Sequence, residues 1–283
     1  MTVSPDLQPD QQPARWDDHV GVYEAVFEPL TNAFARTALD QLNLRPGERL
    51  IDIGAGSGGA ALIAAAEHGA DVLAIDASRE MVSRINTRAQ QQRDCVSRVR
   101  AEIMDGTALS LPDARFDAAI SVFGVILFPD AVGGMREIAR ILKPGGRVAV
   151  VTWTDMERYE LATRLIDAIA SVRGPQPPPS SLPAQLRFRE EAAFHKLLSA
   201  GGLTVESITR AEEQWRLPSA RWIAERIAFA PGLSALVAAL GSDRSAIMEA
   251  FVAGLERDQG RGEVSLSAVA QIGTATKPLI TNE

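Results

Sequence analysis

Short apolar runs alternate with helical patterns over the first half of the chain. Each run has the length of a buried strand, and the runs fall at residues 49–53, 71–75, 98–103, 116–123 and 147–153. The segments after the first, second and fourth runs carry apolar residues at helical spacing, at 60–66, 78–92 and 131–142. Strands that alternate with helices form a mostly parallel sheet with helices on both faces. We therefore expect a doubly wound α/β fold.

Two connections in this region have distinctive patterns. Residues 104–115 connect the third and fourth strands. This connection is short for a crossover that contains a full helix, so we expect a single helical turn or a loop. Residues 143–146 read Lys-Pro-Gly-Gly and are expected to end the preceding helix in a tight turn.

The N-terminal region predicts a tail followed by two helices. Residues 1–14 are rich in Pro, Gln and Asp and are expected to be disordered. Trp16, His19, Tyr23 and Phe27 then recur at helical spacing. This aromatic stripe predicts an amphipathic helix that either packs in the core or forms a lid over a ligand. A second helix is predicted at 31–42.

The pattern changes after residue 153. Helices are predicted at 157–172 and 188–200, joined by a Pro-rich link at 174–181. Two strand-like segments follow, at 203–215 and 264–276. The residues between them predict helices, at 222–240 and 246–255.

A glycine-rich stretch follows the first strand. The apolar run ends with Asp52 and Ile53, and Gly54, Gly56 and Gly58 follow before a helix begins. Strand, glycine turn and helix form the opening unit of nucleotide-binding α/β folds. Gly54, Gly56 and Gly59 also fit the G-x-G-x-x-G pattern of dinucleotide-binding proteins. The carboxylate of Asp52 would repel a pyrophosphate, whereas a cationic ligand would gain from it.

Acidic residues also follow the second and third strands. Asp76 lies about 20 residues after Gly56, a spacing at which this architecture places an acid on a ribose. Asp76 could instead cap the helix that starts near Ser78. Asp105 could meet an adenine amino group or be an ordinary loop aspartate. Since the carboxyl ends of parallel strands meet at one edge of the sheet, we expect these acids to gather there.

Composition narrows the function classes. The chain has 283 residues, 46% of them hydrophobic, and a net charge of −7. The negative charge argues against a nucleic-acid partner, and no apolar run is long enough to span a membrane. Cys95 is the single cysteine and the three histidines are scattered, so no spacing indicates a metal site. We expect a cytoplasmic protein, with homo-oligomerisation left open.

The sequence resembles class I S-adenosylmethionine (SAM)-dependent methyltransferases, in particular the small-molecule group that includes quinone-biosynthesis enzymes. Four blocks carry the resemblance in order: Asp52 to Gly58, Asp76, 104–112 with Phe116-Asp117, and Leu142-Lys143-Pro144-Gly145-Gly146. The spacing of Trp16 and Tyr23 also resembles the lid helix of this group. The resemblance is strong over about residues 16–153 and weak afterwards.

The resemblance implies a Rossmann-like, seven-stranded, mostly parallel sheet with an antiparallel C-terminal hairpin and a helical cap. Residues 15–283 would then form one domain. Its expected parts are lid helices at 15–48, a SAM-binding core at 49–153, helices and the Pro-rich link at 154–202, and the hairpin at 203–283 with the cap inserted at about 218–262.

The resemblance also implies a role for each residue of the cofactor site. Asp52 and the turn would bind the methionine part of SAM, Asp76 the ribose, and Tyr23 would cover the site. The complete expected set is Tyr23, Asp52, Gly54, Ala55, Gly56, Gly58, Asp76, Ala77 and Met81 (adenine), Asp105 and Gly106 (adenine edge), and Val122 and Phe123 (sulfonium).

The implied activity is methyl transfer from SAM to a hydrophobic small molecule, with S-adenosylhomocysteine (SAH) as the product. The acceptor could be a phenol, quinone, polyketide or isoprenoid, methylated on oxygen or carbon. His19 is the candidate base if the acceptor must lose a proton. The aromatic residues expected to line the acceptor pocket are Trp16, Phe128, Trp153, Trp215 and Trp222. Two alternatives stay open: an NAD(P)-dependent oxidoreductase and a SAM-binding protein without catalytic activity.

Overall fold

The computed structural model describes residues 7–177, 182–229 and 233–279. Its strands form one seven-stranded sheet in the order β3-β2-β1-β4-β5-β7-β6. The strand bounds are β1 Arg49–Ile53, β2 Asp71–Asp76, β3 Val99–Ile103, β4 Phe116–Val122, β5 Leu142–Trp153, β6 Thr204–Leu217 and β7 Val264–Thr276. Strands β1 to β5 pair in parallel, and β7 pairs antiparallel with both β5 and β6. The predicted fold class is confirmed.

Helices cover both faces of the sheet. Their bounds are α1 Pro13–Asp17, α2 Val20–Val26, α3 Glu28–Leu42, α4 Gly59–His68, α5 Arg79–Gln91, α6 Ala131–Ile141, α7 Glu160–Arg173, α8 Glu191–Leu198, α9 Ala220–Ala224, α10 Ser234–Ala238 and α11 Arg244–Gln259. Helices α3 and α4 pack on each other and on the sheet, and α6 and α8 do the same. The central strands are buried on both sides, which explains why they read as continuous apolar runs.

Short 3-10 helices occupy several connections. They are η1 Pro9–Gln11, η2 Val125–Leu127, η3 Met156–Arg158, η4 Ala184–Leu186, η5 Ala200–Gly202, η6 Ile227–Phe229 and η7 Gly241–Asp243. The connection from β3 to β4 contains turns and no helix among its residues. Of the two possibilities expected from the sequence, a helical turn or a loop, the structure has the loop.

Local sequence sets the ends of the helices. The Ser78 hydroxyl accepts a hydrogen bond from the Met81 amide and so caps α5. The Asp130 carboxylate caps α6 through the Gly133 amide. Gly69 ends α4 in a left-handed conformation that costs glycine little.

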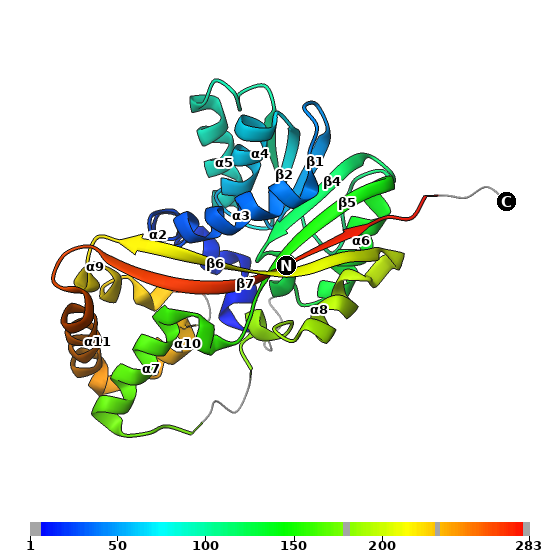
Figure 1. The fold of residues 1–283 in the computed structure, drawn as a ribbon. Helices are drawn as coiled ribbons and strands as arrows, with labels where there is room; N and C mark the ends of the chain where they lie inside the picture. The colour runs from blue at the N-terminus through cyan, green and yellow to red at the C-terminus, as the bar shows by residue number, and fades with distance from the viewer. Residues whose placement is uncertain (1–6, 178–181, 230–232, 280–283) are drawn as a thin grey trace.

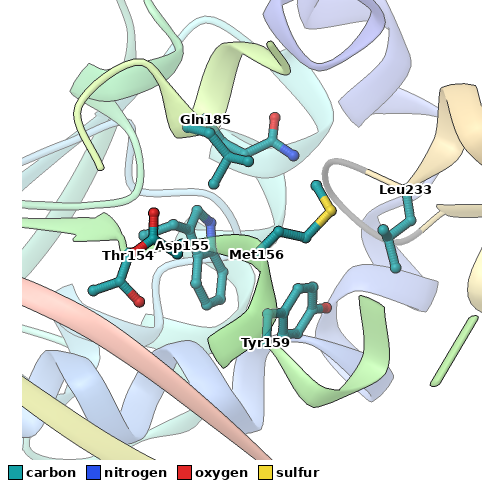
Figure 2. Close-up of a pocket in the computed structure, with 8 residues that line it drawn as sticks. Thr154, Asp155, Met156, Tyr159, Gln185 and Leu233 are labelled. Atoms are coloured by element: carbon teal, nitrogen blue, oxygen red, sulfur yellow. The ribbon is translucent and has the colours of Figure 1, made fainter. Parts of the chain in front are cut away.

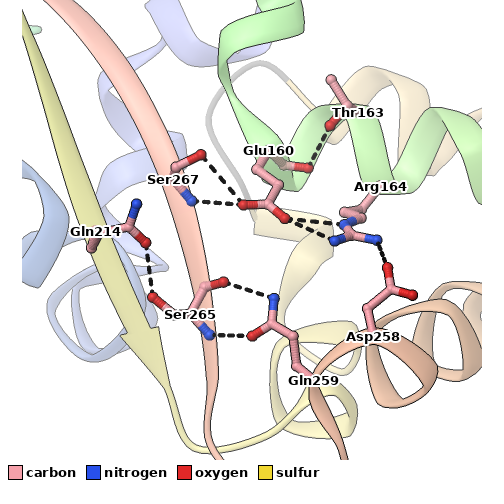
Figure 3. Close-up of polar contacts among 8 residues, drawn as sticks. All are labelled: Glu160, Thr163, Arg164, Gln214, Asp258, Gln259, Ser265 and Ser267. Carbon is pink, nitrogen blue, oxygen red and sulfur yellow. Dashed lines mark hydrogen bonds and ion pairs between the residues drawn. The ribbon is translucent and has the colours of Figure 1, made fainter.

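The β6–β7 hairpin joins the sheet to a helical cap. In Figure 1 the two long strands run from the sheet toward α7, α9, α10 and α11. Polar contacts fix this region (Figure 3): Glu160 accepts hydrogen bonds from the Ser267 amide and from Arg164, which also pairs with Asp258. The cap is therefore tied to β7 through α7 and to α11.

The structure corrects three details of the sequence interpretation. Residues 143–146 do not form a free turn, because β5 already begins at Leu142. Phe116 pairs with Leu142 and Ala118 with Arg147, so the extra residues form a bulge with Gly145 in a left-handed conformation. The segment expected to be helical at 222–240 is divided into α9, η6 and α10. Residues 230–232 lie outside the described residues.

The third correction concerns the N-terminal tail. Residues 1–6 lie outside the described residues, but residues 7–14 are ordered. Gln11 donates a hydrogen bond to the Leu127 carbonyl, and Gln8 accepts one from the Ala184 amide. Composition suggested disorder here, but these side-chain amides find backbone partners on η2 and η4. Residues 178–181 of the Pro-rich link are also outside the described residues.

No helix of the described ranges is both long and apolar enough to cross a membrane.

Candidate active site

The glycine turn after β1 requires glycine at three positions. Gly54, Gly56 and Gly58 have φ values of 69°, 56° and 91°, in the left-handed region that side chains disfavour. Gly59 does not share this conformation. A Cβ there would lie 2.0 Å from the Asn32 side-chain oxygen, so Gly59 is needed for close packing of α3. The turn thus follows the D-x-G-x-G-x-G pattern, with glycines at 54, 56 and 58.

Asp52 carries a buried carboxylate beside this turn. The side chain is 1% exposed, and Oδ2 has no hydrogen-bond partner among the described residues. Burial raises the pKa of Asp52 to about 7, and the nearby charge of Asp76 adds to this effect. An unpaired buried carboxylate is costly, so a cationic ligand here would relieve that cost.

A pocket of about 290 Å³ opens beside Asp52, and we call it the glycine-turn pocket. It lies between the turn, α3 and the end of β4. The expected cofactor residues that line it are Tyr23, Asp52, Gly54, Ala55 and Val122. Glu28, Thr31 and Asn32 of α3 also line it, and the sequence offered no signal for them because each occupies an ordinary helix position.

Asp76 lies at the end of β2, next to the turn. Its two oxygens accept hydrogen bonds from the Gly56 and Ser78 amides, both at 2.9 Å. Burial raises the pKa of Asp76 to about 6, and these amide hydrogen bonds act in the opposite direction. The side-chain cap of α5 is Ser78 rather than Asp76, so the Asp76 carboxylate joins the turn to the start of α5.

The N-terminal helices cover the glycine turn. Asp17 of α1 accepts hydrogen bonds from the Ser78 hydroxyl at 2.6 Å and from the Glu80 amide at 3.1 Å. The Tyr23 ring of α2 lies against Gly56, where an added Cβ would be 3.4 Å from the ring. Burial raises the pKa of Tyr23, so its hydroxyl stays protonated.

A second acid lies on the other side of the turn. Glu28, at the start of α3, is 5% exposed. Its Oε1 accepts hydrogen bonds from the Ser57 hydroxyl at 2.5 Å and from Arg88 at 2.6 Å. Unlike Asp52, Glu28 is therefore paired, and it fixes the turn to α3 and α5.

The expected adenine residues lie around the ends of β2 and β3, outside the lining of the glycine-turn pocket. Met81 is buried in α5 and Ala77 is exposed. Asp105 is also exposed and accepts hydrogen bonds from the Thr107 amide and hydroxyl, at 2.8 and 2.7 Å. These hydrogen bonds within the loop are typical of an ordinary loop aspartate, and they leave part of the Asp105 carboxylate accessible.

Phe128 lies with the cofactor residues rather than with an acceptor pocket. A Cβ on Gly106 would be 2.4 Å from the Phe128 ring, and one on Gly54 would be 3.9 Å from it. The sequence placed Phe128 on the acceptor, but the η2 turn after β4 directs its ring back toward these glycines.

The end of β4 is tightly packed and strained. Phe123 has a φ of 58°, which is unusual for a bulky residue. A Cβ on Gly124 would lie 2.6 Å from the Ile53 carbonyl oxygen. The Ser121 hydroxyl bonds to that same carbonyl at 2.7 Å. These contacts join the ends of β4 and β1, and strain of this kind is typical of functional sites.

A second pocket, of about 310 Å³, lies beyond the end of β5, and we call it the β5-end pocket (Figure 2). Its lining residues are Trp153, Thr154, Asp155, Met156, Tyr159, Gln185, Leu186 and Leu233. The Trp153 ring is stacked between Phe123 at 4.1 Å and Tyr159 at 5.0 Å. Trp153 lines this pocket, and its contact with an acceptor stays a prediction.

Three other tryptophans lie outside both pockets. Trp215 is 2% exposed and packs on Phe27 in the core. Trp16 packs edge-on against Phe229, and Trp222 lies under Arg226. We therefore assign Trp16, Trp215 and Trp222 no contact with an acceptor.

His19 also lines neither pocket. Its ring stacks on Phe229 with the centroids 4.4 Å apart, and its Nδ1 is 2.7 Å from the Arg15 carbonyl oxygen. The expectation of a base came from the helical spacing of His19 and Tyr23. His19 precedes α2 and does not lie within it, and its ring packs on Phe229.

The acceptor-side residues that the sequence missed come from segments without a motif. Tyr159 precedes α7, Met156 lies on η3, and Gln185 and Leu186 lie on η4. The sequence predicted the helices on either side of these connections. The hydrophobic pattern did not indicate that the connections themselves line one pocket.

Comparison with known proteins adds to this geometry. Residues 51–150 match a family model described as a methyltransferase domain. The 27-O-demethylrifamycin SV methyltransferase of Amycolatopsis mediterranei is 37% identical over 135 residues, 48% of each chain. The demethylmenaquinone methyltransferase of Beutenbergia cavernae is 31% identical over 153 residues, 53% of this chain and 60% of that protein. The chain thus spans about half the length of the curated relatives it matches.

The fold is also found in solved structures. The 4+2 cyclase SpnF is similar with a TM-score of 0.55 and 21% identity, over 88% of this chain and 81% of that one. At this identity the likeness shows the fold and no more.

Proposed function

We propose that the chain transfers a methyl group from SAM to a hydrophobic small molecule, because residues 51–150 match a family model described as a methyltransferase domain. The observation that carries this proposal is the unpartnered carboxylate oxygen of Asp52 beside the glycine turn. SAM offers an amino group and a sulfonium to such a carboxylate. The turn itself places backbone amides at the start of α4.

The residues around the glycine-turn pocket fit SAM in type and position. Asp52 and the turn would hold the methionine part, and Asp76 the ribose. Asp76 keeps accepting capacity for a ribose hydroxyl, because a carboxylate can accept about four hydrogen bonds and the backbone amides of Gly56, Ser78 and Ala77 supply at most three. Met81, Ala77, Asp105 and Gly106 would surround the adenine, with Phe128 packed behind Gly106. Val122 and Phe123 would lie nearest the sulfonium.

The same charges argue against a dinucleotide cofactor. Asp52 lines the pocket without an ion-pair partner among the described residues, and Asp76 lies next to the turn. A pyrophosphate would bring negative charge against these carboxylates in a poorly solvated site. A cationic nucleoside gains from the same arrangement.

Bound SAM would supply an activated methyl group, so the main task of the protein is to align the acceptor. Orientation can lower a barrier by roughly 7–11 kcal/mol in well-aligned systems. Phe123, Trp153 and Tyr159 form a stacked aromatic series between the two pockets, and we propose that it orients the acceptor. We assign no residue as a general base. His19 lies outside both pockets, and a raised pKa keeps the Tyr159 hydroxyl protonated.

The acceptor class follows from the lining of the β5-end pocket and from the relatives. The lining is mostly apolar and aromatic, as in sites for hydrophobic ligands. One relative is described as a 27-O-demethylrifamycin SV methyltransferase and another as a demethylmenaquinone methyltransferase. A polyketide or quinone-like acceptor, methylated on oxygen or carbon, is consistent with both.

Two measurements test the proposal. Calorimetry should detect SAM and SAH binding and no NAD⁺ binding, and Asp52→Asn should weaken SAM binding. Methyl transfer should then be followed by mass spectrometry with phenols, hydroquinones and polyketides as acceptors. Because the fold also occurs in a cyclase, binding alone does not establish transfer. Binding of SAM with no product from any acceptor would favour a SAM-binding protein without this activity, and binding of NAD⁺ instead would overturn the proposal.

A further inference from the structure

The β5-end pocket contains one buried polar side chain whose hydrogen-bonding capacity is unused. Gln185 is 5% exposed, and its Oε1 has no hydrogen-bond partner among the described residues. Figure 2 shows Gln185 on the opposite side of the pocket from Tyr159, with Met156 between them. A buried oxygen without a partner destabilises the protein, and a hydrogen bond from a ligand hydroxyl would remove that cost.

Gln185 is also held in place. Arg187, two residues after Gln185, donates hydrogen bonds to the Ile126 and Phe128 carbonyls, both at 2.6 Å. On the other side, the Ala184 amide donates to Gln8 at 2.7 Å. Helix η4 is therefore fixed to η2 at the end of β4, so the backbone that carries Gln185 is held at the pocket before any ligand binds. Such preorganisation is what a recognition group needs.

The remaining lining is uncharged or compensated. Trp153, Met156, Leu186 and Leu233 offer apolar surface. Tyr159 stays neutral, because burial raises its pKa. Asp155 is exposed and lies 3.3 Å from the Arg189 guanidinium, which balances its charge. This lining disfavours an ionised ligand and suits an apolar one with a single polar group.

We propose that Gln185 anchors the methyl acceptor by accepting a hydrogen bond from a free hydroxyl of an uncharged, ring-containing molecule. The apolar part of that molecule lies against Trp153, Met156 and Leu233. The identification of this ligand as the acceptor rests on the proposed methyltransferase function, whereas the hydroxyl contact itself can be tested without turnover.

The test compares two probes that differ in one hydrogen-bond donor. These are 2-naphthol, which has a free hydroxyl, and 2-methoxynaphthalene, which does not. Binding is measured by fluorescence at pH 6.5 with saturating SAH. The wild type should bind 2-naphthol more tightly, by about two- to tenfold, as expected for one hydrogen bond. Gln185→Leu should abolish this preference by weakening 2-naphthol binding.

Met156→Leu is the matched control, because it changes an apolar lining residue of similar volume and leaves the amide intact. It should preserve the preference for 2-naphthol. If Gln185→Leu does not fold, as judged by thermal unfolding, Gln185→Met provides the same test with an unbranched side chain.

The outcomes separate the two proposals. If SAH binds but the wild type binds neither probe, or binds both equally, the anchor is overturned and the proposed function is untouched. A preference that survives in Gln185→Leu also overturns it. If SAH itself fails to bind, the proposed function fails. A preference for 2-naphthol measured without SAH, and lost in Gln185→Leu, would still support the hydroxyl contact.

Discussion

The ring of Phe123 stacks on the indole of Trp153 with their centroids 4.1 Å apart and their planes inclined by 19°. Val122, next to Phe123, lines the glycine-turn pocket, and Trp153 lines the β5-end pocket. The stacked pair therefore lies between the two pockets, where the left-handed backbone of Phe123 holds its ring.

Replacing Phe123 should affect transfer more than cofactor binding. We expect Phe123→Leu to fold with SAH affinity within about threefold of the wild type, because an apolar side chain of similar size remains. The flat surface would be lost, and acceptor turnover should fall by about tenfold or more through poorer alignment. Calorimetry with SAH and kcat/KM for the acceptor measure the two effects. Unchanged kcat/KM would contradict an orienting role for the ring.

The pKa of Asp52 makes stability depend on pH. Between the ordinary carboxyl pKa of 3.8 and the native value of about 7, the native protein holds a proton that the unfolded chain releases. The free energy of unfolding should therefore fall as pH rises through this window, by at most about 1.4 kcal/mol per pH unit. Asp52→Asn should reduce this slope.

Urea denaturation at pH 5 and pH 7.5 measures that slope. Asp76, with a native pKa of about 6, contributes in the same direction, so Asp52→Asn should flatten the dependence without removing it. Asp71→Asn is the control, because Asp71 is exposed at the other end of β2. An equally steep slope in Asp52→Asn and the wild type would exclude Asp52 as its source.

Loss of the Asp76 carboxylate should weaken cofactor binding. We expect Asp76→Ala to cost about 1–3 kcal/mol of SAH affinity, from lost charge-assisted hydrogen bonds to the ribose and a less rigid turn at Gly56. Asp71→Ala, on the same strand, should leave SAH affinity unchanged. Calorimetry on both variants gives the comparison, and equal affinities would argue against a ribose contact.

The N-terminal helices should loosen without Asp17. Asp17→Ala removes the bonds from α1 to Ser78 and Glu80, contacts comparable to a helix cap at about 0.5–2 kcal/mol. Trypsin should then cleave after Arg15 about two- to thirtyfold faster, because cleavage follows the population of the open form. Asp18→Ala is the neighbouring control and should match the wild type. No change in Asp17→Ala would mean that other contacts hold α1.

The strand, glycine turn, helix and second strand of this region could be predicted from the sequence because the pattern is local, and the cofactor roles of their residues stay predictions. The carboxylate of Asp52, the three left-handed glycines and Asp76 lie on one strand–turn–helix–strand unit, so spacing alone placed them together. The bounds predicted for β1 and β7 match the structure.

The acceptor half could not be predicted in this way. Gln185 and Tyr159 line one pocket because η4 is bonded to η2 and Tyr159 follows β5, and no periodicity predicts such an arrangement. Trp215 was expected to line the acceptor pocket because it is aromatic. In the structure its strand directs the side chain into the core, where it packs against Phe27. His19 drew attention by its helical spacing with Tyr23, and its ring packs on Phe229 outside the lining of both pockets.

The two pockets also follow the order of the chain. Residues up to Val122 line the glycine-turn pocket, and residues from Trp153 onward line the other. A crossover within β5 would therefore exchange one ligand specificity while leaving the other intact. A designed chimera joined within β5 could therefore change what is recognised after residue 153 without disturbing the donor side.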